Sequence, residues 1–122
     1  MTQEKKDLLL KDLCARLPYG VKVELSYQIP LKLLSIGVNG SAWVTGDKGY
    51  PFEIDWSNCK PYLFPMSSMT KEQNLEYLHT CKGSYVGTPT LKSFEWCDKN
   101  HFDYRGLIPM GLANDATGLN IY

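Results

Sequence analysis

Apolar residues recur at three- and four-residue intervals in the first positions of the chain. They are Leu9, Leu10, Leu13, Cys14 and Leu17. This spacing predicts a helix over residues 3–17 with a wide apolar stripe on one side. Thr2 is suited to cap the start of this helix, and the Pro18-Tyr19-Gly20 sequence is expected to end it.

Period-two alternation replaces the helical spacing after residue 20 and predicts several strands. Residues 21–28 alternate apolar and polar side chains without a break, which is typical of a half-buried strand. Asn39-Gly40 separates two further strand-like runs and suits a tight hairpin turn. A second turn at residues 46–49 leads into an alternating run over residues 52–56. Short connections without intervening helices predict an antiparallel meander of about four strands, small, twisted and partly barrel-like.

Helical signals return in the C-terminal half. The proline-flanked residues 61–65 are expected to stay extended and to run along the edge or over the end of the sheet. Thr70 and Gln73 fit a capping box for a helix that reaches about Cys81. Pro89 suits the first turn of a last helix. The pattern therefore predicts two C-terminal helices.

These elements predict an α+β fold in a single domain over residues 1–122. The chain is 43% hydrophobic and 21% charged, which is typical of a globular protein with one core. Thirteen Lys and Arg balance thirteen Asp and Glu. A net charge of zero gives no global attraction to nucleic acids or anionic membranes. No stretch approaches 18 apolar residues, so we expect no membrane-spanning segment.

The N-terminus and the cysteines indicate a cytoplasmic protein. Lys11, Asp12 and Arg16 interrupt the N-terminal apolar run before it takes the form of a signal peptide. The four cysteines are unevenly spaced and include no CxxC pair. In the absence of an export signal, we expect their thiols to stay reduced.

The sequence HFDYRG places His101, Asp103, Tyr104 and Arg105 within five positions. We interpret this cluster first as the end of the last helix or of a short turn after it. His101 and Arg105 suit the negative pole of the helix dipole, and Asp103 can form a solvated pair with Arg105. Gly106 then takes the left-handed conformation that closes a helix.

The same cluster allows a sharper alternative. If the helix continues to Arg105, then His101, Tyr104 and Arg105 share one helical face and could bind an anion. The glycines of the chain lack the spacing and setting of a phosphate-binding loop, so nothing else in the sequence supports this hypothesis.

A metal site and an enzyme active site are weaker alternatives. His79, Cys81, Cys97 and His101 could together ligate zinc, but neither pair has the short spacing of a zinc knuckle. The chain lacks the GxSxG and HExxH motifs. Glu53 and Asp55 project from one face of a predicted strand, which is typical of its solvated side. We therefore predict no catalytic residue and no cofactor, and a non-enzymatic role is favoured.

Eight Tyr, four Phe and three Trp make the chain rich in aromatic residues. Several tyrosines lie in predicted loops, where some must be partly exposed, and Tyr, Trp and Arg commonly anchor protein interfaces. We therefore expect a small interaction protein with a protein partner that the sequence does not identify. The residues expected to bind it are Tyr62, Phe64, His101, Asp103, Tyr104 and Arg105.

A nucleic-acid-binding module is the alternative from another class. A small curved sheet could offer Trp43 and Trp56 for stacking on bases. Lys32, Lys48 and Lys60 would then contact the phosphates. The net charge of zero counts against this alternative.

Three segments of the chain stand out together: LLLKDLCARLPYGVKV, KPYLFPMSSMT and HFDYRGLIPMGLA. They resemble a family of short proteins of unassigned function from gut Bacteroidales and their phages or prophages. The resemblance covers about half of the chain, at its start, middle and end. It implies a cytoplasmic accessory protein of mobile-element origin, and it carries no catalytic residue over to this chain.

Overall fold

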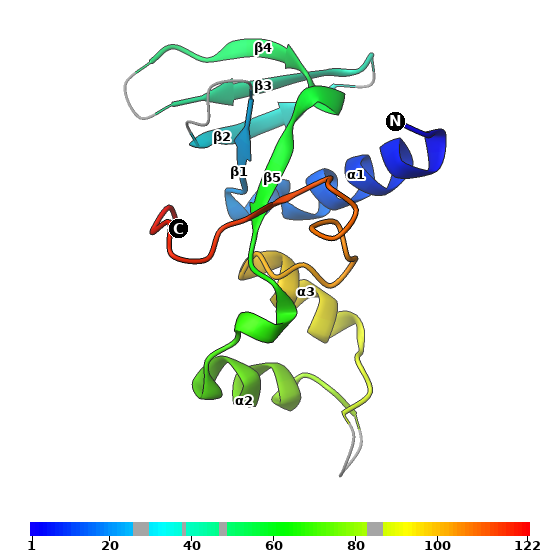
Figure 1. The fold of residues 1–122 in the computed structure, drawn as a ribbon, viewed down its shortest axis with the longest axis vertical. Coiled ribbons are helices and arrows are strands. Elements are labelled where there is room, and N and C mark those ends of the chain that lie inside the picture. Colours follow the sequence, from blue (N-terminus) through cyan, green and yellow to red (C-terminus); the bar gives the residue numbers. More distant parts are fainter. Residues whose placement is uncertain (26–29, 38, 47–48, 83–86) are drawn as a thin grey trace.

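A computed structural model describes the chain except for residues 26–29, 38, 47–48 and 83–86. In the described part, one helix precedes a sheet, two helices follow it, and the C-terminal segment returns beside the sheet (Figure 1). The helices are α1 (Gln3–Arg16), α2 (Lys71–His79) and α3 (Leu91–Lys99). The strands are β1 (Lys22–Glu24), β2 (Pro30–Ile36), β3 (Ser41–Thr45), β4 (Phe52–Asp55), β5 (Lys60–Leu63) and β6 (Asn114–Asp115). The α+β class is confirmed.

The six strands form one sheet in the order β4-β3-β2-β1-β5-β6. The first four strands are the predicted antiparallel meander, since each pairs with the next along the chain. The stretch expected along the sheet edge forms β5 instead, antiparallel to β1 and parallel to β6. Pro61 is tolerated because it pairs only with Val23 of β1, and β6 reaches only Tyr62 and Leu63.

The partly barrel-like shape is not observed in the described part of the chain. The sheet is open, with β4 and β6 at its two ends and no pairing between them. The predicted strand over residues 21–28 is a β-strand only over Lys22–Glu24, and residues 26–29 lie outside the described part. The hairpin between β2 and β3 is confirmed. Gly40 has a φ of 89°, and the Asn39 side chain accepts a hydrogen bond from the Ser41 hydroxyl at 2.6 Å.

Helix α1 covers one face of the sheet with part of the predicted stripe: Leu9 and Leu13 are buried, whereas Cys14 is exposed. Thr2 caps its start by accepting a hydrogen bond from the Lys5 backbone N–H at 3.2 Å. Its buried leucines join β1, β2 and β3 in the main hydrophobic core. The buried members of this core are Leu9, Leu13, Val21, Val23, Leu33, Ala42, Val44 and Cys59. A second, smaller cluster lies where the C-terminal segment meets β5, and it consists of Leu63, Leu107, Leu112 and Ala113.

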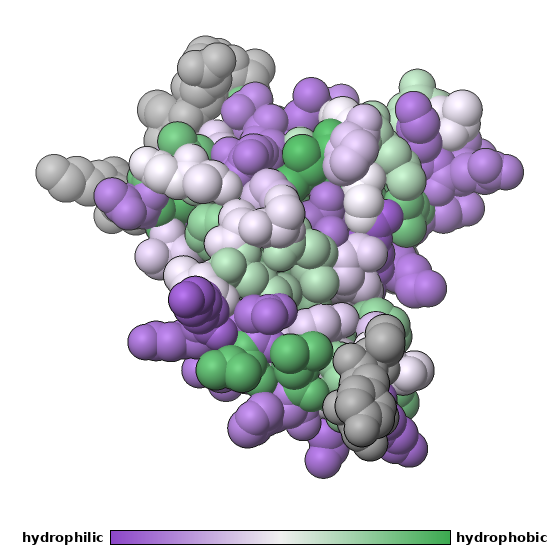
Figure 2. Space-filling model, turned by 60° about the horizontal axis from the view of Figure 1, so that its bottom comes forward, coloured by the Kyte–Doolittle hydropathy of each residue, from purple (hydrophilic) through white to green (hydrophobic). Residues whose placement is uncertain are grey.

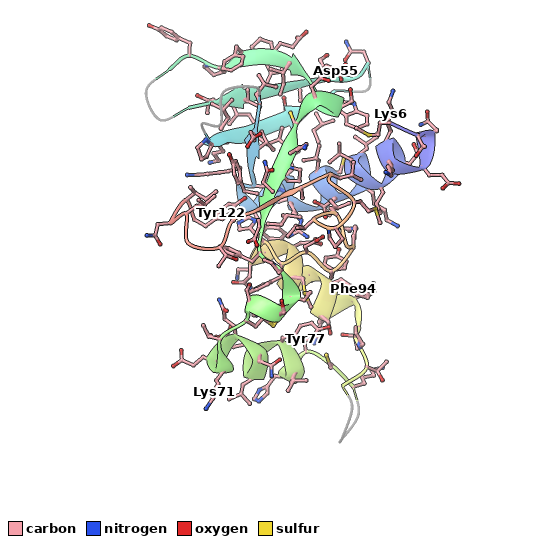
Figure 3. The ribbon with its side chains drawn as sticks, viewed as in Figure 1. Lys6, Asp55, Lys71, Tyr77, Phe94 and Tyr122 are labelled. Carbon is pink, nitrogen blue, oxygen red and sulfur yellow. The ribbon has the colours of Figure 1, made fainter. Side chains whose placement is uncertain are left out.

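The two C-terminal helices occupy the end of the molecule away from the sheet (Figure 1). The capping box of α2 is confirmed: Thr70 and Gln73 exchange hydrogen bonds of 2.9 and 3.1 Å. Helix α3 has Thr90 as its N-cap, so Pro89 precedes the cap and does not lie in the first turn. Tyr77 of α2 lies between the two helices, where its ring packs on Trp96 (Figure 3). None of the helices in the described residues is long and apolar enough to cross a bilayer.

Candidate functional site

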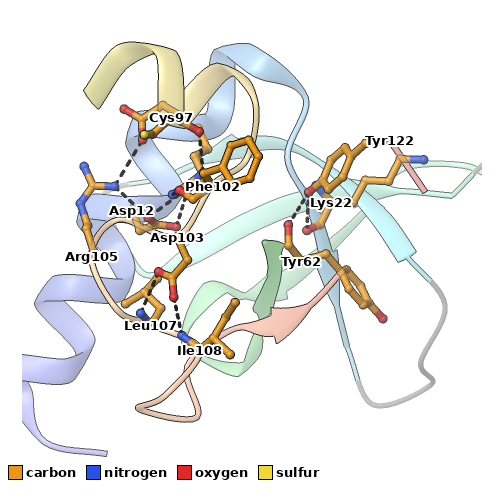
Figure 4. A network of polar contacts seen from close by, with 12 residues as sticks. Asp12, Lys22, Tyr62, Cys97, Phe102, Asp103, Arg105, Leu107, Ile108 and Tyr122 are labelled. Atoms are coloured by element: carbon orange, nitrogen blue, oxygen red, sulfur yellow. Dashed lines mark hydrogen bonds and ion pairs between the residues drawn. The ribbon is translucent and has the colours of Figure 1, made fainter. Parts of the chain in front are cut away.

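A buried network of ion pairs connects α1 with α3 and the segment after it. Asp12 and Arg16 lie one turn apart on α1 with side chains that are fully buried, and the Arg16 Nε lies 3.0 Å from the Asp12 carboxylate. The Arg105 guanidinium binds the same carboxylate at 2.7 Å and Asp98 of α3 at 3.4 Å. Burial raises the pKa of Asp12, and the two guanidinium groups oppose that shift. Two cations and two anions thus balance inside the fold (Figure 4).

Arg16 also holds the end of α3. Its guanidinium donates to the Cys97 carbonyl at 3.2 Å and to the Phe102 carbonyl at 2.6 Å. The Cys97 carbonyl belongs to the last turn of α3 and also accepts from the Phe102 N–H, whereas the Phe102 carbonyl lies beyond the helix. The N-terminal helix therefore fixes the position of the whole turn from α3 into the C-terminal segment.

Helix α3 ends at Lys99, just before the polar cluster. Asn100 is its C-cap, and His101 takes the left-handed conformation with a φ of 62°. The Phe102 N–H donates to the Cys97 carbonyl at 2.9 Å, and the His101 N–H donates to the Asp98 carbonyl at 3.4 Å, which closes the helix in a Schellman motif. Gly106 also has a positive φ, but it belongs to a later turn. The helix does not continue to Arg105, as the alternative required, because His101 already reverses the chain and takes the closing position expected for Gly106.

The early end of α3 separates the polar residues that the sequence clusters. His101, Tyr104 and Arg105 share no helical face, so the predicted anion-binding trio is not formed. Asp103 is buried and does not pair with Arg105 as expected; its carboxylate accepts from the Leu107 and Ile108 N–H groups at 2.8 and 2.9 Å (Figure 4). Asp103 therefore shapes the next turn.

His101 packs inside the fold. Its ring stacks on Tyr122 with a centroid distance of 3.8 Å, and its Nδ1 is buried without a hydrogen-bond partner. Burial, and to a smaller extent the nearby charge of Arg16, lower the pKa of His101 to about 4. The Tyr122 hydroxyl donates to the Tyr62 carbonyl at 2.8 Å and accepts from the Lys22 N–H at 2.8 Å. The imidazole is therefore neutral and held against the C-terminal segment.

The other predicted binding residues, Tyr62 and Phe64, lie on and just after β5. Tyr62 is buried, with its hydroxyl 3.2 Å from the Glu24 carboxylate, so the expectation that it is exposed is wrong. Phe64 is half-buried because its ring packs on both Phe102 and Tyr122. Tyr62 is buried because β6 and Tyr122 of the returning C-terminal segment lie against β5.

The four residues of the zinc alternative do not gather. The described residues contain no group of three or more His, Cys, Asp or Glu side chains placed to hold a metal ion. His79 is exposed at the end of α2, and Cys97 is buried on α3, where burial raises the pKa of its thiol to about 11. The Cys81 sulfur lies 3.5 Å from the Ser93 hydroxyl.

The open face of the sheet has mixed charge. Trp43 stands on this face, but Trp56 packs against the main core and is not beside it. Lys48 lies outside the described residues. In the strand register, lysines and carboxylates occur in equal number on this face, namely Lys22, Lys32, Lys60, Glu24, Glu53 and Asp55. The described part of the sheet therefore lacks the basic surface that phosphate contacts need.

Tyr104 and Arg105 form part of a groove between α1 and α3. The groove has a volume of about 740 Å³. It is lined by Leu8, Lys11, Ala15, Pro18, Tyr19, Leu91, Phe94, Glu95, Asp98, Tyr104 and Arg105. Leu91 is 86% exposed, although apolar, and Phe94 is 38% exposed. A concave surface with apolar walls and a few polar groups is the usual form of a binding site.

The floor of this groove is fixed by side-chain contacts. The Tyr104 ring stacks on Phe94 at 5.0 Å, and the Arg105 guanidinium lies 4.4 Å from the Tyr104 ring centroid. Asp12 and Asp98 hold the other side of that guanidinium. Sequence reasoning found Tyr104 and Arg105 but missed Leu91 and Phe94. Leu91 and Phe94 are three residues apart on a short helix, which places them on one face. This spacing does not identify a binding surface, because it is equally typical of residues that face the core.

Comparisons with known proteins add no relative to this geometry. A scan against protein-family models finds no match, and neither the curated proteins nor the solved structures give a significant match. The class that the coordinates define is an α+β protein with an open, mostly antiparallel sheet and a groove between two helices. The resemblance to the Bacteroidales family stays a prediction.

Proposed function

We propose that this chain is a small, non-enzymatic interaction protein that binds a protein partner in the groove between α1 and α3. The observation that carries the proposal is the exposure of Leu91 and Phe94 beside a Tyr-Arg pair whose position is fixed. Exposed apolar residues that line a concave surface are typical of interaction sites. Tyr and Arg are also among the residues that contribute most to binding at protein interfaces.

The rigidity of the groove supports this role. Binding is weakened when side chains must be ordered at the interface. The Arg105 side chain is only 12% exposed and already bonded to Asp12 and Asp98, and the Tyr104 ring lies between Arg105 and Phe94. A partner would therefore meet side chains that lose little further freedom.

We extend the proposal to the setting of the protein. All four cysteines are free thiols, which is usual in the reducing cytoplasm. The resemblance to proteins of Bacteroidales phages adds the expectation of an accessory protein from a mobile element. The proposal does not depend on that origin.

A selection from a random library of 16-residue peptides tests the proposal. The bait is the wild-type protein, and the recovered peptides are then measured against Leu91→Glu. This substitution should preserve the fold because Leu91 is highly exposed and a carboxylate suits the first turn of a helix. Leu75→Glu is the matched control, since Leu75 is a 59% exposed leucine on α2, outside the groove.

We expect the recovered peptides to bind Leu91→Glu at least about tenfold more weakly than the wild type, a loss of about 1.4 kcal/mol. Their affinity for Leu75→Glu should be unchanged. Peptides that bind both variants like the wild type would show that the groove is not the site. Recovery of no binding peptide would overturn the proposal.

A further inference from the structure

The two walls of the groove are helical stripes, and the wall on the α1 side is the longer one. On α1 the lining residues Leu8, Lys11 and Ala15 follow each other at intervals of three and four residues. On α3 the residues Leu91, Phe94 and Asp98 have the same intervals. Residues three and four apart lie on one face of a helix. The α3 wall therefore presents about two helical turns, or about 10 Å, to the groove, and the α1 side continues beyond Ala15 through Pro18 and Tyr19.

We infer that the partner segment is an amphipathic α-helix, an inference that rests on the proposed function. The space between two helices is suited to a third, because the side-chain ridges of one helix pack into the grooves of its neighbours. Peptide helices bind in this way through apolar residues at i, i+3 or i+4, and i+7. Two turns of wall match that span.

The charges at the two rims of the groove predict which flank of the partner helix is acidic and which is basic. Lys11 on the α1 wall and Glu95 on the α3 wall are both exposed, and neither forms an ion pair within the described residues. The deeper charges Asp98 and Arg105 neutralise each other. The partner helix therefore has acidic residues on the flank that faces α1 and basic residues on the flank that faces α3.

The peptides recovered from the random library test this inference separately from the proposed function. A helical occupant predicts apolar residues at three- and four-residue intervals in the recovered sequences. Proline placed in the middle of the tightest peptide should then weaken binding at least about 100-fold, because proline breaks a helix interior. The recovered peptides could instead show apolar residues at every second position and bind equally well with that proline. If such peptides still lost affinity for Leu91→Glu, the proposed function would stand, but the inference of a helical partner would be overturned.

The charge assignment has its own test in the double variant Lys11→Glu with Glu95→Lys. Exchanging Lys and Glu on the flanks of the tightest peptide should weaken its binding to the wild type at least about tenfold. The same exchanged peptide should recover its affinity with the double variant. Equal binding of both peptides to the wild type would overturn the inferred polarity. Leu75→Glu again serves as the control, and it should bind both peptides as the wild type does.

Discussion

Helices α2 and α3 are alike in length and in their N-cap residue and different in their surroundings. Both have nine residues, and both follow an N-cap threonine whose N–H donates at 2.9 Å to the side chain three residues on. Helix α3 buries Ser93, Cys97 and Asp98, whereas no residue of α2 is buried. The same N-cap signal therefore begins one helix that is part of the core and one that lies at its margin, and the more amphipathic sequence belongs to the helix in the core.

The difference shows what each helix depends on. A helix of nine residues is marginal in water without tertiary contacts. Arg16 and the ion pairs hold α3, while the contact of Tyr77 with Trp96 is the principal aromatic support of α2. Leu75 and Leu78 remain exposed, and Figure 2 shows hydrophobic side chains among hydrophilic ones at this end of the molecule. The groove is formed by the helix that is held firmly.

The largest expected effect comes from removing the shared carboxylate of the network. Asp12→Ala leaves the buried Arg16 and the largely buried Arg105 without their common partner, so we expect a loss of about 3–5 kcal/mol in the free energy of unfolding. Urea denaturation measures this loss of stability. Asp7→Ala, on the exposed side of the same helix, is the control and should change stability by less than about 0.5 kcal/mol. A loss below about 1 kcal/mol for Asp12→Ala would show that the network does not hold α1 to α3.

The next effect is a dependence of stability on pH that arises from His101. Its pKa is about 4 in the folded protein and near 6.5 when unfolded, so the unfolded chain binds a proton that the folded chain does not. The contribution of His101 is complete above about pH 6.5 and falls as the pH drops toward 4, by roughly 3 kcal/mol in total. Burial raises the pKa of Asp12, so its contribution to the free energy of unfolding changes with pH in the opposite direction over the pH range in which Asp12 titrates.

His101→Asn isolates this titration. Asparagine tolerates the left-handed conformation but does not titrate, and the Asp12 contribution is common to both proteins. Urea denaturation of both proteins at a series of pH values should show the wild type losing more stability between pH 6.5 and 4. If the free energy of unfolding changed with pH in the same way in both proteins, His101 would not be buried in its neutral form.

The smallest effect distinguishes the two helices most finely. Thr70→Ala removes the hydroxyl that accepts from the Gln73 N–H, at a cost of about 1 kcal/mol to α2. Because α2 contributes no buried residue, this loss should appear in its local opening and hardly in global unfolding. Hydrogen exchange by NMR should show faster exchange over α2 alone. Equal acceleration over α2 and α3 would mean that the helices open together.

Much of the fold could be predicted because local patterns determine it. The apolar stripe of α1, the turn at Asn39-Gly40 and the capping box of α2 all depend on residues close in sequence. The parallel pairing of β5 with β6 could not be predicted, because a two-residue strand has no pattern of its own. Its position depends on contacts between segments some 50 residues apart along the chain.

The candidate site was harder to predict than the fold. Tyr104 and Arg105 drew attention through their residue types, but Asp12, which binds Arg105, comes from α1, 93 residues away along the chain. The end of α3 at His101 also breaks a local rule, because glycine or asparagine is expected in that conformation. The turn is held in this conformation by the stacking of His101 on Tyr122 and by the hydrogen bonds from Arg16. Such tertiary support has no sequence signature.

The most direct test of the account is to map where a recovered peptide contacts the protein. Backbone amide NMR shifts, followed during titration with the tightest library peptide, report which segments meet it. We predict shifts over residues 8–19 and 91–105, which line the groove, and none over α2. Shifts centred on Leu75 and Leu78 of α2, with residues 91–105 unchanged, would contradict the account.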